Sequence, residues 1–536
     1  MVANGLQLDS IGYSCYNNLK HQSCICFHSK GEYRSMKKRL LPIAVLLLTL
    51  FLLCSCRSVN EVAVYTRANE ATPEDVAASL SSHATASQFA VDTWQIVLPD
   101  VHAPEAEKAF LEAGYVSVGA SAVDGSRNPP KVFRADHTLV TLQQTDEGVR
   151  IVWDICDPSI TSLLFPNENT GKISASMVQL GVERGAAIDN PMIGMCYIYK
   201  LSDGSAVILD GGTLENADNL YAALKKLDID KDENGRYRIT AWIFSHGHQD
   251  HYGAFTAFAD QYHEKTDISY VMYSFPTDGI SLASNDCDVT AFTELVRACY
   301  PNAVHVTPHA GLRYHFDNLT LDMLYTPEAL SFVDYANDTS LIFIADVAGA
   351  RVLHTGDAGN RAAEAAWSMY EKETFLADAL QITHHGLYTA GTGDVHEWTY
   401  LRSVYEATEA TIGLLPMGTR SPTDERNGRH TVINQWAHWD FQTSFIFDNR
   451  VTETNMFSDS QEDYDRFVME VASGTSRDQT LCGYDGRNTI VNANGTTTYI
   501  MSTETENMAT VFHLSAQGMQ ILANEPLLAW LQSISE

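Results

Sequence analysis

The sequence predicts an α/β fold in which two α/β layers pack back to back. Segments of strand length and strand composition alternate with segments of helical periodicity through the middle of the chain. Three of the apolar segments lead into polar clusters, which begin at Ser245, Thr355 and Thr383. Because each cluster follows a strand, we expect the three clusters to lie on the same edge of the fold.

The composition indicates a large, acidic, globular protein. The chain has 536 residues, of which 45% are hydrophobic, and this length suggests two to four domains with ample cores. Its 35 basic and 67 acidic residues give a formal net charge of −32. This charge argues against a general nucleic-acid or anionic-membrane surface, so we expect no obvious nucleic-acid-binding surface. It leaves room for a local basic or metal-lined cleft, and it does not indicate an oligomeric state.

The amino terminus has the pattern of a processing signal. Residues 37–39 are basic, and the apolar segment 40–53 is too short to span a bilayer easily. This segment ends in Leu53-Cys54-Ser55-Cys56, which resembles the lipobox of a bacterial lipoprotein, with Cys56 as the lipidated residue. An ordinary signal peptide or a short anchor helix is the alternative. We therefore expect an extracytoplasmic protein, either anchored to the bacterial membrane or secreted, and we interpret residues 1–35 as an upstream extension.

One loop carries most of the predicted chemistry. Four candidate metal ligands lie within six residues: His246, His248, Asp250 and His251. They follow a strand at 238–244, and residues 254–258 have the pattern of a helix start, so we expect the ligands on a strand-to-helix loop. Imidazole suits zinc, iron and copper, and a carboxylate among imidazoles suits a second ion. A His-rich turn without metal is the alternative, but it does not readily explain the H-x-H-x-D-H spacing.

Two further motifs end apolar segments later in the chain. Residues 351–355 lead into Gly356-Asp357, and residues 379–383 lead into His384-His385-Gly386. Asp357 could bridge two metal ions because a carboxylate has two oxygens to share. Each motif is a weak or moderate signal alone, but their order behind H-x-H-x-D-H makes the set a strong signal of a dinuclear metal site.

These motifs together resemble the signature of the metallo-β-lactamase superfamily. The resemblance implies a four-layer αββα sandwich, which we place at residues 171–450, and an enzyme of the hydrolase class. A small α+β domain at 57–170 without a catalytic constellation would precede it. Residues 451–536 would form a C-terminal, β-rich extension, in which Asn494-Gly495 is a strong hairpin signal.

The resemblance also implies roles for individual residues. Six side chains would be metal ligands: His246, His248, Asp250, His251, Asp357 and His385. His246 and His248 would hold one ion, and Asp250 and His251 would hold the other. Asp357 would bridge the two ions, and His385 would complete the second site. His384 would face the phosphate or the leaving group, and it is counted with Asp250 as catalytic. Asp210, at the end of an early hairpin, would brace the metal loop, because metal ligands need partners that hold their ring orientation.

One departure from the family pattern narrows the resemblance. Many members carry a further His ligand in a Thr-Pro-Gly-His-Thr segment, where this chain has Thr326-Pro327-Glu328 and then Asn337-Asp338-Thr339-Ser340. The pattern resembles the subgroup that contains the hydrolase domain of ComEC-type competence proteins and bacterial phosphorylcholine esterases. Asp338 is either a substitute ligand or a turn residue. Four residues are candidates for substrate binding: Asn337, Asp338, Arg420 and His430.

The predicted chemistry is metal-assisted hydrolysis. Two divalent ions, with zinc favoured over manganese, would lower the pKa of a shared water and yield a hydroxide nucleophile. The subgroup resemblance favours a phosphodiester bond in a small-molecule or polymer substrate. A lactone, thioester or amide on the same fold remains open, as does a metal-carrying surface protein with little turnover. A β-lactamase is disfavoured by the missing His.

Overall fold

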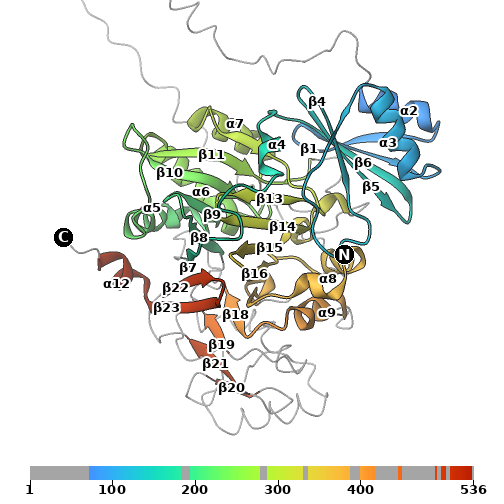
Figure 1. The fold of residues 1–536 in the computed structure, drawn as a ribbon. Coiled ribbons are helices and arrows are strands. Elements are labelled where there is room, and N and C mark those ends of the chain that lie inside the picture. The colour runs from blue at the N-terminus through green and yellow to red at the C-terminus, as the bar shows by residue number, and fades with distance from the viewer. Residues whose placement is uncertain are drawn as a thin grey trace, which may run out of the picture. The chain divides into compact units, whose positions relative to one another are not determined.

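Three β-sheets organise the fold, and each carries helices on one face (Figure 1). The structure, a computed structural model, describes residues 72–182, 194–277, 287–329, 336–386, 399–416, 445–448, 489–491, 497–501 and 508–533. Contacts divide the chain into residues 1–68 and 69–536, and every described residue lies in the second unit. The expected signal segment with Cys56 lies outside the described residues. Among the helices that are described, none has the length and hydropathy to cross a bilayer.

The first sheet is antiparallel, with the strand order β1-β2-β6-β5-β4-β3. Its strands are β1 (Thr85–Ala90), β2 (Thr93–Leu98), β3 (Val116–Val118), β4 (Lys131–Ala135), β5 (Thr138–Thr145) and β6 (Gly148–Ile155). Helices α2 (Pro73–Leu80) and α3 (Ala103–Glu112) bury Ala77 and Phe110 against it. Helix α2 begins at Pro73 because Thr72 and Asp75 form a capping box there. The short helix α4 (Ile160–Leu163) leads from this sheet towards the next.

The second sheet has the order β12-β11-β10-β9-β8-β7-β22-β23. Its strands are β7 (Ala175–Leu180), β8 (Cys196–Lys200), β9 (Ala206–Asp210), β10 (Tyr237–Ile243), β11 (Thr266–Met272), β12 (Val304–Val306), β22 (Met508–Ser515) and β23 (Gly518–Pro526). Four helices pack on its outer face: α5 (Ala217–Lys226), α6 (Gln249–Tyr262), α7 (Val289–Cys299) and α12 (Leu527–Gln532). Strands β9 to β12 are parallel, so their carboxyl ends meet at one edge.

The third sheet has the order β13-β14-β15-β16-β17-β18-β19-β21-β20. Its strands are β13 (Arg313–Phe316), β14 (Leu319–Tyr325), β15 (Ile342–Val347), β16 (Ala350–His354), β17 (Ala379–Gln381), β18 (Ile412–Leu415), β19 (Phe445–Asp448), β20 (Thr489–Val491) and β21 (Thr497–Met501). Helices α8 (Asn360–Met369) and α9 (Thr399–Thr408) cover its outer face. Strands β16, β17 and β18 are parallel, so they too end at a common edge.

The second and third sheets pack face to face. One buried apolar cluster contains Met177 and Ile243 from the second sheet together with Phe343 and Leu414 from the third. The helices lie on the opposite faces of these two sheets, in two separate clusters. The predicted αββα sandwich is therefore confirmed. Burial of both sheet faces explains why their strands are nearly continuous apolar segments rather than alternating ones.

The chain closes the sandwich with residues distant in sequence. Strand β22 pairs with β7, and Ala509 lies opposite Leu180 in the register. The sequence predicted neither β7 nor the hairpin of β22 and β23. The last helix, α12, begins only at Leu527, because residues up to Pro526 pair within β23. By contrast, the sequence predicts a helix at 289–299 and a strand at 319–325, and helix α7 (Val289–Cys299) and strand β14 (Leu319–Tyr325) have these bounds.

The first sheet packs against the segments that follow β12 of the second sheet and β14 of the third sheet. The hydroxyl oxygens of Thr93 in β2 and Thr307 after β12 are 3.0 Å apart. The amide Nε2 of Gln95 donates a hydrogen bond of 3.2 Å to the carbonyl of Glu328, which follows β14. The N-terminal sheet therefore contacts the same edge of the sandwich at which the metal loop leaves β10.

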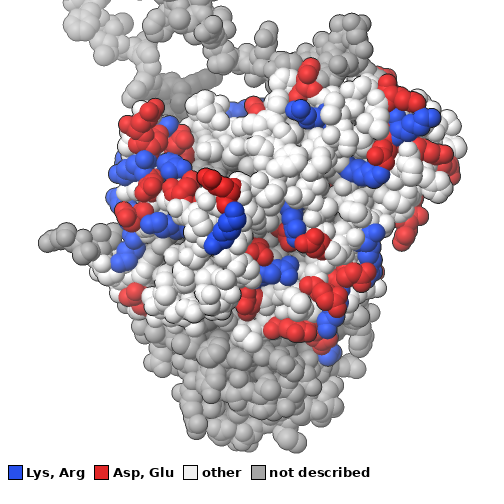
Figure 2. Space-filling model, in the orientation of Figure 1, with Lys and Arg blue, Asp and Glu red and all other residues white. Residues whose placement is uncertain are grey.

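The described surface carries both signs of charge. Figure 2 shows Asp and Glu side chains in mixed groups with Lys and Arg side chains on the visible face. Ion pairs of this kind include Arg238 Nη2 with Asp203 Oδ2 at 2.6 Å and Arg236 Nη2 with Asp232 Oδ2 at 2.7 Å. On this face the acidic excess of the sequence is thus interspersed with basic side chains.

Candidate metal centre

The metal loop is shorter than the sequence predicted. Helix α6 begins at Gln249, so Asp250 and His251 lie in its first turn and not on the loop itself. The backbone N–H groups of His251 and Tyr252 donate to the carbonyl of His248, which closes this turn. An acidic side chain in a first turn is stabilised by the helix dipole, and this explains why the helix extends back to Asp250. The helical backbone therefore fixes two of the six predicted ligands relative to each other.

Asp210 holds the metal loop against the end of β9. Its carboxylate accepts hydrogen bonds from the Ser245 backbone N–H at 2.7 Å and from the Ser245 hydroxyl at 2.8 Å. It also accepts one from His251 Nδ1 at 2.7 Å. Since Asp210 is an acceptor, His251 carries a proton on Nδ1, and its Nε2 faces the cluster. The left-handed backbone of Asp210 (φ 55°) is the turn that aims its carboxylate at this loop.

A similar contact orients His385. Its Nδ1 lies 2.6 Å from the carbonyl oxygen of Pro416, which can only accept, so the proton is on Nδ1 and Nε2 faces the cluster. His384 and His385 both have left-handed backbones, with φ of 50° and 55°. Strain of this kind in two successive non-glycine residues is typical of functional sites. The turn places two neighbouring imidazoles at the end of β17.

Asp357 reaches the centre from the end of β16. Its backbone N–H donates to the Ser340 hydroxyl at 3.0 Å. The preceding Thr355 N–H donates to the side chain of Gln381 at 2.7 Å. Gly356 has a left-handed backbone, and a Cβ at this position would lie 2.9 Å from the side chains of Ser245 and Ser340. The close approach therefore requires glycine and holds the Asp357 loop beside the metal loop.

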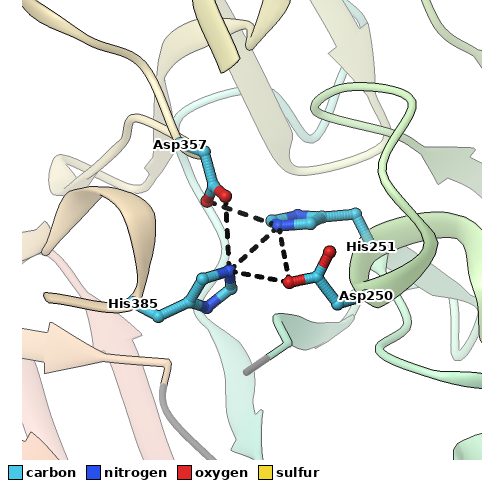
Figure 3. Close-up of side chains that lie close together, drawn as sticks. All are labelled: Asp250, His251, Asp357 and His385. Carbon is cyan, nitrogen blue, oxygen red and sulfur yellow. Dashed lines mark hydrogen bonds and ion pairs between the residues drawn. The ribbon is translucent and has the colours of Figure 1, made fainter. Parts of the chain in front are cut away.

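Four side chains from three segments converge at the first candidate ion site, as Figure 3 shows. They are Asp250, His251, Asp357 and His385. His385 Nε2 lies 3.2 Å from Asp250 Oδ2 and 3.3 Å from Asp357 Oδ2. His251 Nε2 lies 3.3 Å from Asp357 Oδ1 and 3.1 Å from His385 Nε2. The rings of His251 and His385 and the carboxylate of Asp357 are almost completely buried, and only Asp250 of the four is partly exposed.

A second candidate ion site shares Asp357 with the first. It consists of His246, His248 and Asp357. His246 Nε2 lies 2.9 Å from His248 Nδ1 and 3.7 Å from Asp357 Oδ2. Asp357 is therefore the residue common to both groups, in the bridging position that the family resemblance implied.

The donor set of these groups fits divalent metal ions. In their neutral forms His251 and His385 would point the lone pairs of their Nε2 atoms at each other across 3.1 Å, since their Nδ1 atoms already donate elsewhere. The Oδ1 atom of Asp357 is buried and has no hydrogen-bond donor. Buried acceptors that face one another are unfavourable unless a cation or a proton lies between them. Imidazole nitrogens and carboxylate oxygens are ligands that zinc accepts.

Protons compete with metal at this centre. Burial lowers the pKa of His385, but Asp357 and Asp250 beside it outweigh burial and raise the pKa to about 9. Burial opposes ionisation of Asp357, yet the imidazoles of His385, His251 and His246 hold its pKa well below the ordinary value. The carboxylates therefore stay ionised, and a bound ion must displace protons from the rings.

The remaining predicted residues differ in their positions. The amide Nδ2 of Asn337 is 3.3 Å from His384 Nε2, and His384 Nε2 is 3.9 Å from Asp357 Oδ2, so both lie beside the centre. Asp338 lies outside both ligand groups, and its carboxylate is 3.9 Å from Arg361 Nη1. The predicted substrate-binding residues Arg420 and His430 lie outside the described residues.

Sequence reasoning missed several groups that support the centre. Ser245 and Ser340 belong to the motifs described above, and their small hydroxyl side chains could have indicated close packing at these positions. The carbonyl of Pro416 and the amide of Gln381 gave no signal, because neither has a residue type or a spacing that indicates this role. Glu328, in the segment where the family resemblance implied a further His, lies with Oε1 at 3.2 Å from Nδ1 of the buried His309.

Comparison with known proteins supports the fold assignment. The profile of the Metallo-beta-lactamase superfamily matches residues 189–393. No curated protein matches the chain. This segment is thus a metallo-β-lactamase superfamily domain, and the predicted enzyme class, a hydrolase on this fold, is confirmed.

Solved structures similar to the chain include proteins of this fold at low sequence identity. A diphosphatase of the PhnP family is 11% identical, with 45% of this chain and 85% of that one covered and a TM-score of 0.28. Zinc-bound PqqB from Methylobacterium extorquens is 11% identical, with coverages of 51% and 88% and a TM-score of 0.30. A putative metallo-β-lactamase from Thermotoga maritima is 17% identical, with coverages of 34% and 79% and a TM-score of 0.23.

Proposed function

We propose that this protein is a dinuclear metal-dependent phosphodiesterase. The observation that carries the proposal is the position of Asp357, whose two oxygens lie between two groups of imidazoles while one of them lacks a donor. Asp250, His251 and His385 would hold one ion with Asp357, and His246 and His248 would hold the other. We propose zinc as the metal, with manganese as the alternative. Bound divalent ions supply an acidified water and neutralise charge that develops on the reacting group.

The residues of the chain orient this centre and leave part of it open. Asp210 and the carbonyl of Pro416 fix the rings of His251 and His385, and the first turn of α6 fixes Asp250. The group of His246 and His248 has only Asp357 as a third protein ligand among the described residues. A three-ligand site keeps positions for water and substrate, as catalytic zinc sites do.

His384 and Asn337 lie where a leaving group could be met. The His384 side chain is 19% exposed, whereas the rings of His246, His251 and His385 are fully buried. Burial lowers the pKa of His384, so the ring is neutral at pH 7 and keeps one N–H that can donate to a leaving oxygen. The Nδ2 atom of Asn337 contacts this ring, and the Oδ1 atom of the same amide is buried without a hydrogen-bond partner.

Charge supports an anionic substrate. Two divalent ions would bring four positive charges, and the ligand carboxylates of Asp250 and Asp357 together with a hydroxide would bring three negative ones. The excess positive charge at the ions themselves would favour a phosphodiester anion over a neutral lactone or amide. The resemblance to the ComEC-type subgroup points in the same direction, and we include that subgroup assignment in the proposal.

We further propose that the enzyme acts outside the cytoplasm. The support is the basic and apolar signal pattern before Cys56, which would carry the lipid anchor. A lipid-anchored phosphodiesterase would act on a small-molecule or polymer phosphoester at the cell surface. Radiolabelled fatty acid should enter the wild-type protein and not a Cys56→Ser variant, and equal labelling of both would exclude this anchor.

The phosphodiesterase proposal is tested on the purified full chain. Bound metal is measured beside hydrolysis of bis(p-nitrophenyl) phosphate, with Asp250→Ala as the site variant and the exposed Glu105→Gln in α3 as the control. We expect about two ions per chain and an activity that only Asp250→Ala removes. If the protein bound two ions but showed no phosphodiesterase activity, the phosphodiester proposal would be wrong, and a lactone, thioester or amide would be the substrate to test. No bound metal after zinc and manganese have both been offered would overturn it.

A further inference from the structure

A cavity of about 340 Å³ lies between the first sheet and helix α8, apart from the metal ligands. Its walls come from β2, β5, β6 and one face of α8, and they include Gln95, Gln143, Gln144, Arg150 and Arg361. This volume falls within the range of pockets that hold small molecules. Since the walls belong to two different parts of the fold, the cavity exists only where the N-terminal sheet packs on the sandwich.

Arg150 is the chemically unusual residue of this cavity. Its Nη2 donates to the carbonyl of Ala329 at 3.4 Å, but its Nε is buried and has no hydrogen-bond partner. Among the described residues, no ion pair joins its guanidinium to a carboxylate, whereas Arg313, on β13, binds Asp322 at 2.6 Å. An arginine remains charged even when buried. Glu328 and Glu147 interact with this half-buried guanidinium electrostatically but form no ion pair with it, so its charge is only partly compensated and the cavity favours an anionic partner.

The other walls are fixed and polar. Gln143 Nε2 donates to the carbonyl of Asn128 at 2.9 Å, and Gln95 Nε2 donates to that of Glu328 at 3.2 Å. These bonds hold both amides in place, so their oxygens are available to a ligand without reorganisation. The exposed carboxylates of Asp146 and Glu147 also line the cavity. They would repel a polyanion, and thus favour a ligand with a single anionic group.

Arg361 connects the cavity with the metal centre. It lies in the first turn of α8, the helix that follows Asp357, and its Nη1 is 3.9 Å from the carboxylate of Asp338. The neighbouring Asn337 contacts His384. A ligand held by Arg361 would therefore be linked to the metal centre through Asp338 and its neighbour Asn337, which contacts His384.

We propose that this cavity binds a small polar molecule through one anionic group, a phosphate or a carboxylate, held between Arg150 and Arg361. The binding does not depend on the phosphodiesterase activity, because none of the metal ligands lines the cavity. The ligand is either a separate molecule or the part of a substrate that lies away from the metal centre. In both cases an anionic group would contact Arg150.

Calorimetric titration of the purified full chain with inorganic phosphate and, separately, with acetate tests the proposal. We expect at least one of the two anions to bind, and Arg150→Met to weaken that binding at least about tenfold. Asp357→Asn, which alters the metal centre, should leave the arginine-dependent binding intact. Phosphate alone or acetate alone would identify the ligand's anionic group. No binding of either anion at about 10 mM would overturn the proposal.

Stability provides the second readout. Arg150→Met removes a half-buried charge that no ion pair compensates, so the melting temperature without anion should not fall, whereas a purely structural arginine would lower it. Phosphate should raise the melting temperature of the wild type more than that of the variant. Arg361→Gln, on the more exposed side, should weaken binding by a smaller factor. Binding that survives Arg150→Met but disappears in Asp357→Asn would place the anion at the metal centre and contradict the proposal.

Discussion

Two buried clusters of histidine and carboxylate in the described part of the chain are arranged in opposite ways. In the metal centre, imidazole nitrogens face one another and Asp357 has an oxygen without a donor. In the other cluster the single ring of His309 lies between two carboxylates, with Nε2 at 2.6 Å from Asp154 and Nδ1 at 3.2 Å from Glu328. Burial lowers the pKa of His309, but these two carboxylates raise it well above the ordinary value.

The difference shows what distinguishes a metal site from a structural ion cluster. Around His309 every ring nitrogen has an acceptor, so a proton satisfies the whole cluster. In the metal centre there are more facing acceptors than protons can satisfy, and this surplus rather than the residue composition indicates a metal. The His309 cluster has another role, because Asp154 belongs to β6 and Glu328 to the loop after β14, so it joins the first sheet to the sandwich.

The largest effect is expected from Asp357→Asn. The substitution removes the charge shared by both ligand groups, so kcat/KM for a phosphodiester should fall by at least about 10²–10³-fold, with loss of bound metal. Steady-state kinetics and metal analysis measure both quantities. Asp154→Asn is the matched substitution in the structural cluster, and this variant should retain the metal bound at the metal centre. Equal metal loss in the two variants would show that the clusters do not differ as described.

His309→Leu should mainly affect stability. It leaves two buried carboxylates facing each other without the imidazolium, so the free energy of unfolding should fall by about 3–5 kcal/mol. Urea denaturation at pH 7 measures this change, and the exposed His83→Leu is the control. The metal content of the folded fraction should not change. A loss of metal with unchanged stability would contradict the structural role.

A smaller effect is expected from Asp210→Asn. The amide can no longer hold the Nδ1 proton of His251 as the carboxylate does, so the ring is less well oriented and metal affinity should fall about 10–100-fold. Competition with a chromophoric chelator measures the affinity. Asp322→Asn, a buried aspartate paired with Arg313, should leave the affinity unchanged even if the fold is weakened.

The smallest effect is the pH dependence of the His309 contribution. Its pKa is higher in the folded state than the unfolded value of about 6.5, so its stabilising effect is complete below that pH and is lost as pH rises through the folded pKa. The stability difference between wild type and His309→Leu should therefore shrink when urea denaturation is repeated at increasing pH above 6.5. The metal-centre rings titrate in both proteins and cancel in the difference. A constant gap would mean that His309 is not protonated in the folded state.

Much of the fold and of the candidate site was predictable because the signals are local. The apolar segment before Ser245 and the H-x-H-x-D-H spacing predicted a strand and a group of ligands, and the structure brings His246, His248, Asp250 and His251 together. Helix α7 and strand β14 follow from periodicity alone. The two later motifs could be placed at strand ends, so their convergence with the first was also predictable.

The sequence alone therefore determined which residues could hold metal and which class of fold carries them, since residue type, spacing and periodicity are properties of short segments. Only the tertiary structure decided which groups complete each contact. The contact of Pro416, the pairing of β22 with β7, the Asp154–His309–Glu328 cluster and the surroundings of the half-buried Arg150 all depend on residues distant in the chain. A backbone carbonyl or a half-buried charge has no sequence signature of its partner, because packing determines that partner.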